Sequence, residues 1–255
     1  MTRRKGMSSS TFRAVLPLLG AIVACMTAPA LAGGAVLYDQ TDNATGGNYG
    51  SNEWITPNQG YTDQIADDFT VPSGQSWQIS QVDVLGVGSY ASPTVNTFIY
   101  ANAGSLPGAE LFRQSVVATN EPNYSLAVSG TPNLNPGTYW ISVQQTGTSS
   151  VPTAWYWTER SVQSGNPAAY RNPGGLSVAT CTAWSVRSTC ASTSTPDELF
   201  KLSGTASAYP PPATPAALTG QRAAALASCK KRAHKHHWSH NRLKKCKGKA
   251  NLLPV

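Results

Sequence analysis

Histidine is scarce in this chain of 255 residues, and none of its four histidines lies between residues 33 and 206. That segment also contains only two of the five cysteines, Cys181 and Cys190. Ser-His-Asp and Cys-His sites need an imidazole beside the nucleophile. Residues 33–206 therefore cannot assemble either kind of site on their own, which argues against a nucleophilic hydrolase.

Acidic residues are missing from the C-terminal part of the chain. Residues 207–255 contain ten Lys and Arg residues, all four histidines and no acid, whereas residues 33–206 contain five basic and twelve acidic residues. The formal charges of the two segments are +10 and −7, with histidine neutral. A tail of this charge attracts polyanions without sequence specificity. We therefore expect it to bind an anionic cell-wall polymer or another polyanion, and no specific nucleic-acid sequence.

Long apolar runs are also missing after residue 32, and the run at 14–26 is shorter than a membrane-spanning helix requires. It follows basic residues that end at Arg13 and precedes an A-x-A sequence at residues 30–32, which is the pattern of a signal peptide. Residues 1–32 are therefore predicted to be a signal peptide, and the protein to be secreted, either extracellular or associated with the cell surface. The alternative is a lipoprotein signal in which Cys25 is lipidated.

Four cysteines remain after the predicted cleavage, and an even number in an exported protein favours disulfides. Cys181 and Cys190 lie in one Ser/Thr-rich loop, and Cys229 and Cys246 lie in the basic tail. Their proximity predicts the pairs Cys181–Cys190 and Cys229–Cys246. Other pairings would join the two segments across a proline-rich linker.

Residues 33–206 are rich in Gly, Pro, Ser, Thr, Asn, Trp and Tyr and have no long pattern of period 3.6, which is typical of all-β proteins. About ten short strands between turn signals predict an all-β domain, an antiparallel β-sandwich that is jelly-roll-like. The expected strands are 35–39, 66–71, 77–86, 94–101, 109–118, 124–129, 137–145, 154–158, 183–186 and 198–204.

Proline and alanine dominate residues 207–216, which predicts a stiff linker. From there the composition changes to Ala, Leu, Lys and Arg, and residues 217–255 form the cationic Lys/His/Cys tail. Within the tail, residues 221–235 and 242–249 favour two short helices with a break at 236–241. A disordered tail is the alternative.

Several motifs along residues 65–204 resemble a family of exported bacterial β-sandwich proteins. They are IADDFTVP (65–72), FIYANAGSLPGAEL (98–111), PGTYWISV (136–143) and DELFKLSG (197–204), which are similar to the family's "DDFxxP", "IYxDxxGxPG", "PGxYWxSV" and "DLxFxLxG" patterns. The Lys/Cys-rich tail resembles the tails of secreted proteins from high-GC Gram-positive bacteria. The resemblance implies a fold and a compartment, but no activity, and Asn102 replaces the aspartate that is usual in the second pattern.

Two carboxylates are enough for glycosidase chemistry, which makes three acidic residues candidates for catalysis. Glu159 directly follows Trp155-Tyr156-Trp157, and Asp67 and Asp68 are adjacent. The plainer interpretation is that these carboxylates are solvated strand ends. No catalytic residue is therefore assigned, and the protein is expected not to be an enzyme.

Aromatic residues are the better candidates for binding, because their flat faces and polar edges suit sugar rings. Trp155 and Trp157 share one face of a predicted strand, on which they either bind a ligand or fill the core. Residues 42–61 form a long polar stretch that is predicted to be a loop, and it carries Tyr49, Trp54 and Tyr61. These five residues form the predicted ligand-binding set.

A structural calcium ion is the one cofactor for which the sequence offers ligands, namely the side-chain oxygens of Asp39, Asp67, Asp68 and Asn102 near predicted strand ends. No standard calcium motif accompanies them. The plainer interpretation is that Asp67 and Asp68 accept backbone hydrogen bonds in turns.

Taken together, these features predict a secreted, monomeric, non-enzymatic β-sandwich protein. The sandwich is expected to bind a glycan, and the tail to attach the protein to an anionic envelope or matrix. The alternatives are a secreted carbohydrate-active enzyme and a purely structural surface protein.

Overall fold

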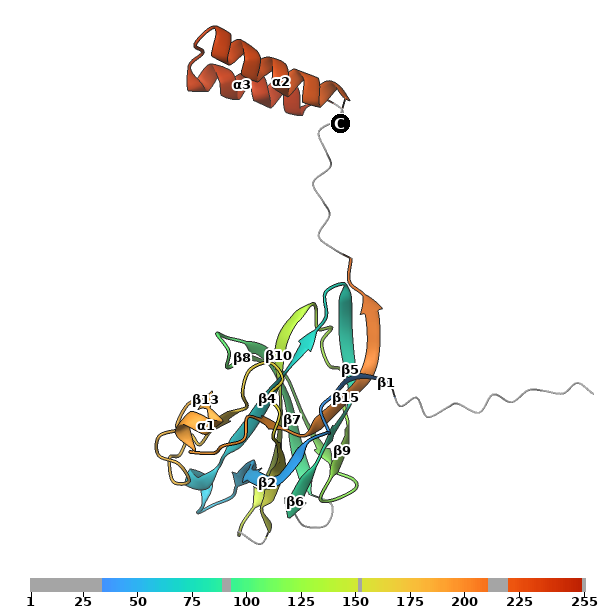
Figure 1. Cartoon of the computed structure of the whole chain (residues 1–255), viewed down its shortest axis with the longest axis vertical. Helices are drawn as coiled ribbons and strands as arrows, with labels where there is room; N and C mark the ends of the chain where they lie inside the picture. The colour runs from blue at the N-terminus through green and yellow to red at the C-terminus, as the bar shows by residue number, and fades with distance from the viewer. Residues whose placement is uncertain (1–33, 89–92, 151–152, 211–219, 254–255) are drawn as a thin grey trace, which may run out of the picture. The chain divides into compact units, whose positions relative to one another are not determined.

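The computed structural model describes residues 34–88, 93–150, 153–210 and 220–253. The predicted signal peptide, with Cys25, and residues 211–216 of the predicted linker lie outside the described residues. The described part consists of a β-rich body and a pair of helices, and Figure 1 shows the elements of each.

Three sheets make up the body. The first sheet is antiparallel and has the order β1 (Ala35–Asp39), β15 (Phe200–Ala208), β5 (Gln75–Val84) and β9 (Tyr124–Ala127). The second has the order β13 (Ser185–Val186), β12 (Ala169–Arg171), β4 (Gln64–Val71), β10 (Gly137–Thr148), β7 (Thr94–Asn102) and β8 (Pro107–Val117). A short strand, β3 (Asn52–Trp54), pairs in parallel with β10.

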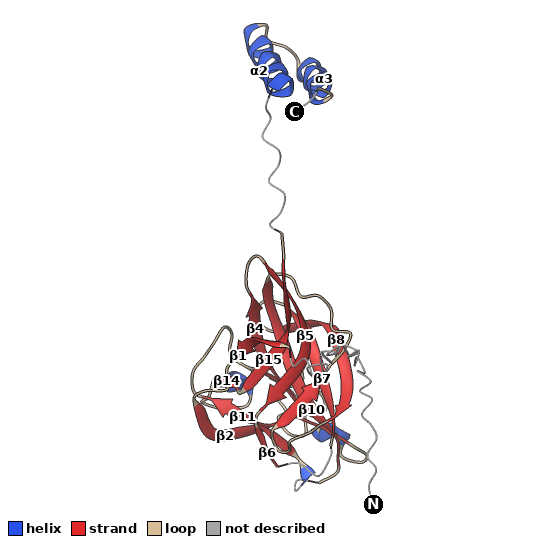
Figure 2. Cartoon of the chain, turned by 90° about the vertical axis from the view of Figure 1, so that its right-hand side faces the viewer, coloured by secondary structure: helices blue, strands red, loops and turns tan. Residues whose placement is uncertain are grey.

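The third sheet is smaller and is centred on β11 (Trp155–Arg160). Its other strands are β14 (Asp197–Glu198), β2 (Ala44–Gly50) and β6 (Gly86–Gly88), all antiparallel to β11. Figure 2 shows that strands make up most of the regular structure of this body. The predicted all-β sandwich is therefore confirmed, although the strands form three sheets rather than the two sheets of an eight-stranded jelly roll.

The main hydrophobic core combines residues from all three sheets. Strand β10 illustrates how the sequence builds it, because its residues alternate between two faces. Ile141 and Val143 lie in the main core, whereas Trp140, on the other face, packs in a second cluster with Phe98 and Tyr100. The second sheet, to which β10 belongs, thus has apolar side chains packed on both faces.

The sequence predicted that residues 42–61 form one long loop, and this prediction is wrong. They contain β2, β3 and a single 3-10 turn at Gln59–Tyr61. The sequence of β2, ATGGNYG, lacks the β-branched alternation of a typical strand. It is nevertheless a strand because it pairs with β11, with Tyr49 opposite Trp157 and Gly50 opposite Tyr156.

The cationic tail forms two helices, α2 (Gly220–Lys235) and α3 (His240–Asn251), as the sequence predicted. They contact each other and are joined by the predicted disulfide Cys229–Cys246. We call this unit the helical hairpin. Within the described residues, no helix combines the length and apolar character needed to cross a membrane.

Candidate functional site

Strand β11 has two faces of different character. Trp155 and Trp157 are 0% exposed and belong to the main core. Their indole N–H groups donate to the carbonyl oxygens of Pro122 (2.9 Å) and Leu199 (2.8 Å). The prediction that these two tryptophans bind a ligand is therefore wrong, because neither offers a free ring face or a free N–H group.

Tyr156, which points to the other face of β11, is half-buried and lines a pocket of about 290 Å³. We call it the Asp63 pocket, after the carboxyl group in its wall. Strand β2 contributes Tyr49 and Gly50, β3 contributes Trp54, and β12 contributes Tyr170. Two of the predicted binding residues, Tyr49 and Trp54, therefore lie in the same pocket.

The third aromatic residue of segment 42–61 lies beside this pocket rather than in its lining. Tyr61 is 42% exposed, and its ring centroid is 6.0 Å from that of Trp54. Its backbone oxygen also accepts a hydrogen bond from the hydroxyl of Ser177, a pocket residue (3.0 Å). Tyr61 thus supports two pocket residues, Trp54 and Ser177.

Asp63 lies just before β4 and is held by Asn52. The two residues exchange backbone hydrogen bonds (2.9 and 3.1 Å), and the N–H of Asn52 also donates to Asp63 Oδ1 (2.7 Å). The side chain of Asn52 pairs with the backbone of Trp155 through Nδ2 (2.8 Å) and Oδ1 (2.9 Å). Asn52 therefore fixes Asp63 relative to β11.

The second oxygen of Asp63, Oδ2, has much weaker protein contacts. It accepts a hydrogen bond from the Tyr170 hydroxyl at 3.5 Å, the limit for such a bond. Burial raises the pKa of Asp63 to about 7, against the lowering effect of its hydrogen bonds to Asn52 and Tyr170. Burial also raises the pKa of Tyr49 and of Tyr170, so both phenols are neutral near pH 7.

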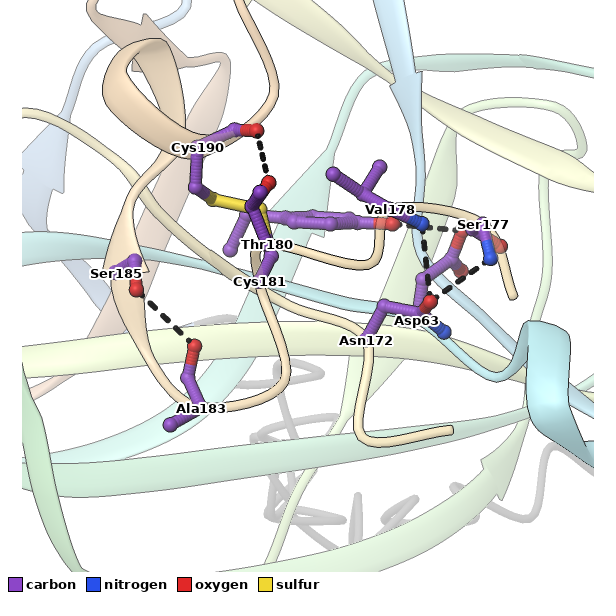
Figure 3. Close-up of a disulfide and its surroundings, with 10 residues drawn as sticks. Asp63, Asn172, Ser177, Val178, Thr180, Cys181, Ala183, Ser185 and Cys190 are labelled. Carbon is purple, nitrogen blue, oxygen red and sulfur yellow. Dashed lines mark hydrogen bonds between the residues drawn. A yellow bond between two sulfur atoms is a disulfide. The ribbon is translucent and has the colours of Figure 1, made fainter. Parts of the chain in front are cut away.

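One wall of the pocket is formed by Ser177 and Val178, which lie just before Cys181 of the predicted disulfide Cys181–Cys190. Figure 3 shows this disulfide, with Ser177 and Val178 beside Asp63. The backbone N–H groups of Ser177 and Val178 donate to Asn172 Oδ1 (2.8 and 3.0 Å). Asn172 is fully buried, and its backbone N–H donates a hydrogen bond to the carbonyl oxygen of Cys181 (2.6 Å). The wall therefore has a fixed shape.

Glu159 is buried outside the lining of this pocket, in an ion pair with Arg187. Arg187 also faces Glu198, with Nε 3.2 Å from Oε1, and donates to the carbonyl oxygen of Thr195 (2.9 Å). A carboxylate that a buried arginine holds in this way is not free to approach a glycosidic oxygen. Glu159 has a structural role in this arrangement.

The two adjacent aspartates of β4 serve different parts of the fold. Asp67 is fully buried and accepts hydrogen bonds from Gln40 Nε2 (2.8 Å) and the N–H of Glu198 (2.7 Å). Asp68 accepts hydrogen bonds from the N–H and side chain of Asn166. Because neighbouring side chains alternate along a strand, the two carboxylates do not act as a pair. They are also not the solvated strand ends of the plainer interpretation.

The remaining predicted metal ligands also have protein partners. Asp39 accepts hydrogen bonds from the N–H (3.0 Å) and hydroxyl (2.7 Å) of Thr41, and Asn102 Oδ1 accepts one from the Trp140 indole (2.9 Å). Within the described ranges, no group of three or more His, Cys, Asp or Glu side chains is arranged to hold a metal ion.

Most of the residues that line the pocket were not predicted from the sequence, among them Asp63, Tyr156 and Tyr170. The alternation of β11 placed Tyr156 on the other face of the strand from Trp155 and Trp157. Once the two tryptophans are assigned to the core, this alternation identifies Tyr156 as the residue that faces away from it. Asp63 and Tyr170 had no such signal, because their proximity depends on the pairing of β12 with β4.

The helical hairpin carries a second candidate surface. Its exposed basic side chains lie on both helices: Lys230, Lys231, Arg232, Lys235, Arg242, Lys244, Lys245 and Lys249. The guanidinium of Arg242, in α3, lies 4.6 Å from the ring centroid of Trp238, which is in the turn between the helices. The described part of the hairpin contains no acidic side chain that could neutralise these charges.

A scan of the sequence against protein-family models and a search of the curated proteins both end without a match. The similarity to exported bacterial β-sandwich proteins therefore stays a prediction from sequence motifs.

Proposed function

We propose that this protein is a secreted, non-enzymatic binding protein. Its β-sandwich binds a carbohydrate at the Asp63 pocket, and its helical hairpin attaches it to an anionic polymer of the cell envelope or matrix. The observation that carries the first part is the composition of the pocket. Three half-buried aromatic side chains, Tyr49, Trp54 and Tyr156, line it together with polar groups of Asn48 and Ser177.

This composition suits a sugar better than a wholly apolar ligand. Aromatic rings pack against the C–H faces of a sugar, and the polar groups at the rim bind its hydroxyls. The volume of about 290 Å³ is close to the lower end for ligand pockets, which favours one sugar unit rather than a long chain.

The two alternatives have less support. An enzyme acting on carbohydrate needs two carboxylates at the scissile bond, and Glu159, Asp67 and Asp68 are engaged elsewhere in the fold. A purely structural protein has no need for a pocket with a fixed wall and half-buried aromatic residues. Neither alternative explains why Asp63 faces this space.

A glycan array with the full-length, oxidised chain tests the binding proposal. We expect specific glycans to be retained, and Trp54→Ala and Tyr156→Ala to lose about 5-fold in affinity, since a ring contact contributes on the order of 1 kcal/mol. Leu111→Ala is the control, because it removes an exposed apolar side chain of β8, outside the pocket. Equal retention by all these variants would reject the pocket as the binding site.

The basic surface of the helical hairpin supports the attachment proposal. A polyanion that binds several of its cations releases counterions, so affinity falls steeply with salt. We expect the full chain to bind purified cell wall at low salt and to lose on the order of a thousandfold in affinity over a fourfold rise in salt.

Charge-matched variants separate attachment from mere solubility of the hairpin. Replacing Lys230, Lys231, Lys244 and Lys245 by Gln should release the protein from the wall, whereas replacing the same four by Arg should not. Binding that is insensitive to salt, or equal in the two variants, would refute electrostatic attachment.

A further inference from the structure

We propose that the ligand of the Asp63 pocket carries an organic ammonium group, as a sugar with a free amine does. This inference rests on the proposed carbohydrate-binding function and specifies the chemistry of the same pocket. Three features support it: a carboxyl group without a counter-charge, a surround of aromatic rings, and the negative charge of the β-sandwich.

Asp63 lacks a cationic partner. It is 8% exposed, and it takes part in none of the ion pairs formed among the described residues. A carboxylate that is buried without a counter-charge is costly. Its pKa of about 7 reflects this cost. An ammonium group in the pocket would supply the missing charge.

The free side of the carboxyl group has room for such a group. A Cβ atom at Gly50 would lie 3.1 Å from Asp63 Oδ2, so the glycine leaves open a space that any other residue would narrow. Oδ2 has the long contact to the Tyr170 hydroxyl, whereas Oδ1 is engaged by the N–H of Asn52. Oδ2 is therefore the atom that would accept a hydrogen bond from the ligand.

Aromatic rings around a carboxylate favour a cation, because each ring face is electronegative. The rings of Tyr49 and Tyr170 are 5.0 Å apart between centroids and stand at 87° to each other. Trp54 and Tyr156 complete the aromatic part of the lining. A neutral sugar would use the ring faces but not the carboxylate charge.

The other charged and titratable groups near the pocket do not replace the missing cation. Arg187 approaches the Tyr49 ring to 5.7 Å, but it is paired with Glu159 and Glu198. The phenols of Tyr49 and Tyr170 have raised pKa values and are neutral near pH 7. Asp63 is therefore the group of this surround that titrates near neutrality, and the net charge of −7 on residues 33–206 further attracts cations.

The test compares three probes on the full oxidised chain by NMR titration at about pH 8: glucosamine, N-acetylglucosamine and glucose. We expect glucosamine to bind at least about 10-fold more tightly than the other two, and Asp63→Asn to remove this preference. Asp39→Asn is the matched control, because it removes the same charge from an exposed site with only local hydrogen bonds to Thr41. Gly50→Ala keeps the charge but narrows the space, and it should weaken glucosamine binding.

A permanently charged probe isolates the titration of Asp63. Tetramethylammonium has no proton to lose, so its affinity should fall about 10-fold between about pH 8 and pH 6 as Asp63 takes up a proton. Equal affinity for glucose and glucosamine would overturn the ammonium inference and leave carbohydrate binding intact. If none of the four probes bound, the Asp63 pocket would be neither a carbohydrate site nor an ammonium site. Any glycans that the chain retained on an array would then bind at another surface.

Discussion

The β-sandwich and the helical hairpin reach an ordered structure by different means. The sandwich buries large aromatic side chains, among them Trp140, Trp155 and Trp157, and it also buries charged groups around Arg187. In the hairpin only Cys229 and Ala250 are buried among the described residues. The sandwich is therefore stabilised mainly by packing, and the hairpin depends on one covalent bond.

The sandwich and the helical hairpin differ in where their charged side chains lie. The sandwich neutralises or protonates its buried charges, because burial makes an isolated charge costly. The hairpin keeps cations of one sign exposed on a small surface, where they repel each other. A bound polyanion, as proposed above, would offset this repulsion. The comparison thus separates residues that stabilise the fold from residues that are available for binding.

The largest expected effect is the loss of Arg187. Arg187→Met removes the only cation that faces both Glu159 and Glu198 in the described structure. Breaking a buried ion pair in this way costs about 3–5 kcal/mol. We expect that loss in the free energy of unfolding of the sandwich, measured by denaturant titration. Arg113→Met, which removes an exposed arginine stacked on Phe98, should cost less than about 1 kcal/mol.

The next effect concerns the disulfide of the hairpin. Helices of 16 and 12 residues are marginal in isolation, and closing this loop contributes about 3 kcal/mol. Replacing Cys229 and Cys246 by Ser should abolish the NMR signals of a folded hairpin and leave the melting of the sandwich unchanged.

In the sandwich, the same change at Cys181 and Cys190 should leave the core folded and weaken ligand binding at the pocket wall. A hairpin that stays helical without its disulfide would contradict the comparison.

A third effect is the pH dependence of the sandwich. The folded pKa of Asp63 is about 7 and that of Asp197 about 6, both above the value of 3.8 for a free side chain, and burial is the main cause. Between the free pKa of 3.8 and the raised folded pKa values, the folded state binds more protons than the unfolded state. The free energy of unfolding therefore rises as the pH falls from about 8 to about 5. The shift of Asp63 corresponds to at most about 4 kcal/mol at high pH.

Asp63→Asn tests this dependence. It should raise the melting temperature of the sandwich at about pH 8 and flatten its dependence on pH, because the neutral amide has no charge to bury. Thermal melting of the wild type and of the variant across this pH range measures the effect. A variant that is less stable than the wild type at pH 8 would mean that the ionised carboxylate has a cationic partner after all.

The sequence was sufficient for the fold class because the fold class depends on local patterns. Strand alternation, as in β10 and β11, and turn residues identified most strands, and the composition of the tail identified its two helices. Strand β2 was missed because its glycine-rich sequence has no intrinsic strand signal and acquires its structure by pairing with β11. The spacing of the cysteines identified both disulfides.

The site was predicted less well because it depends on contacts between distant segments. Tyr49 and Trp54 were predicted to bind a ligand because they lie in one long polar segment, and both line the pocket. Alternation placed Trp155 and Trp157 on one face, but it could not tell whether that face met the core or the solvent. The importance of Asp63 arises from its burial beside Tyr170, which is 107 residues away in sequence.

The smallest expected effect concerns single cations of the hairpin. Lys231 and Lys235 are both exposed and stand one helical turn apart on α2, where like charges repel. Lys231→Gln should therefore stabilise the hairpin by about 0.2–0.5 kcal/mol, measured by amide hydrogen exchange in α2. The same variant should reduce the salt dependence of cell-wall binding by about one counterion. Lys231→Arg, which keeps the charge, should change neither quantity. If Lys231→Gln destabilised the hairpin, the exposed cations would contribute to the fold, and the separation between stabilising residues and binding residues would fail in this region.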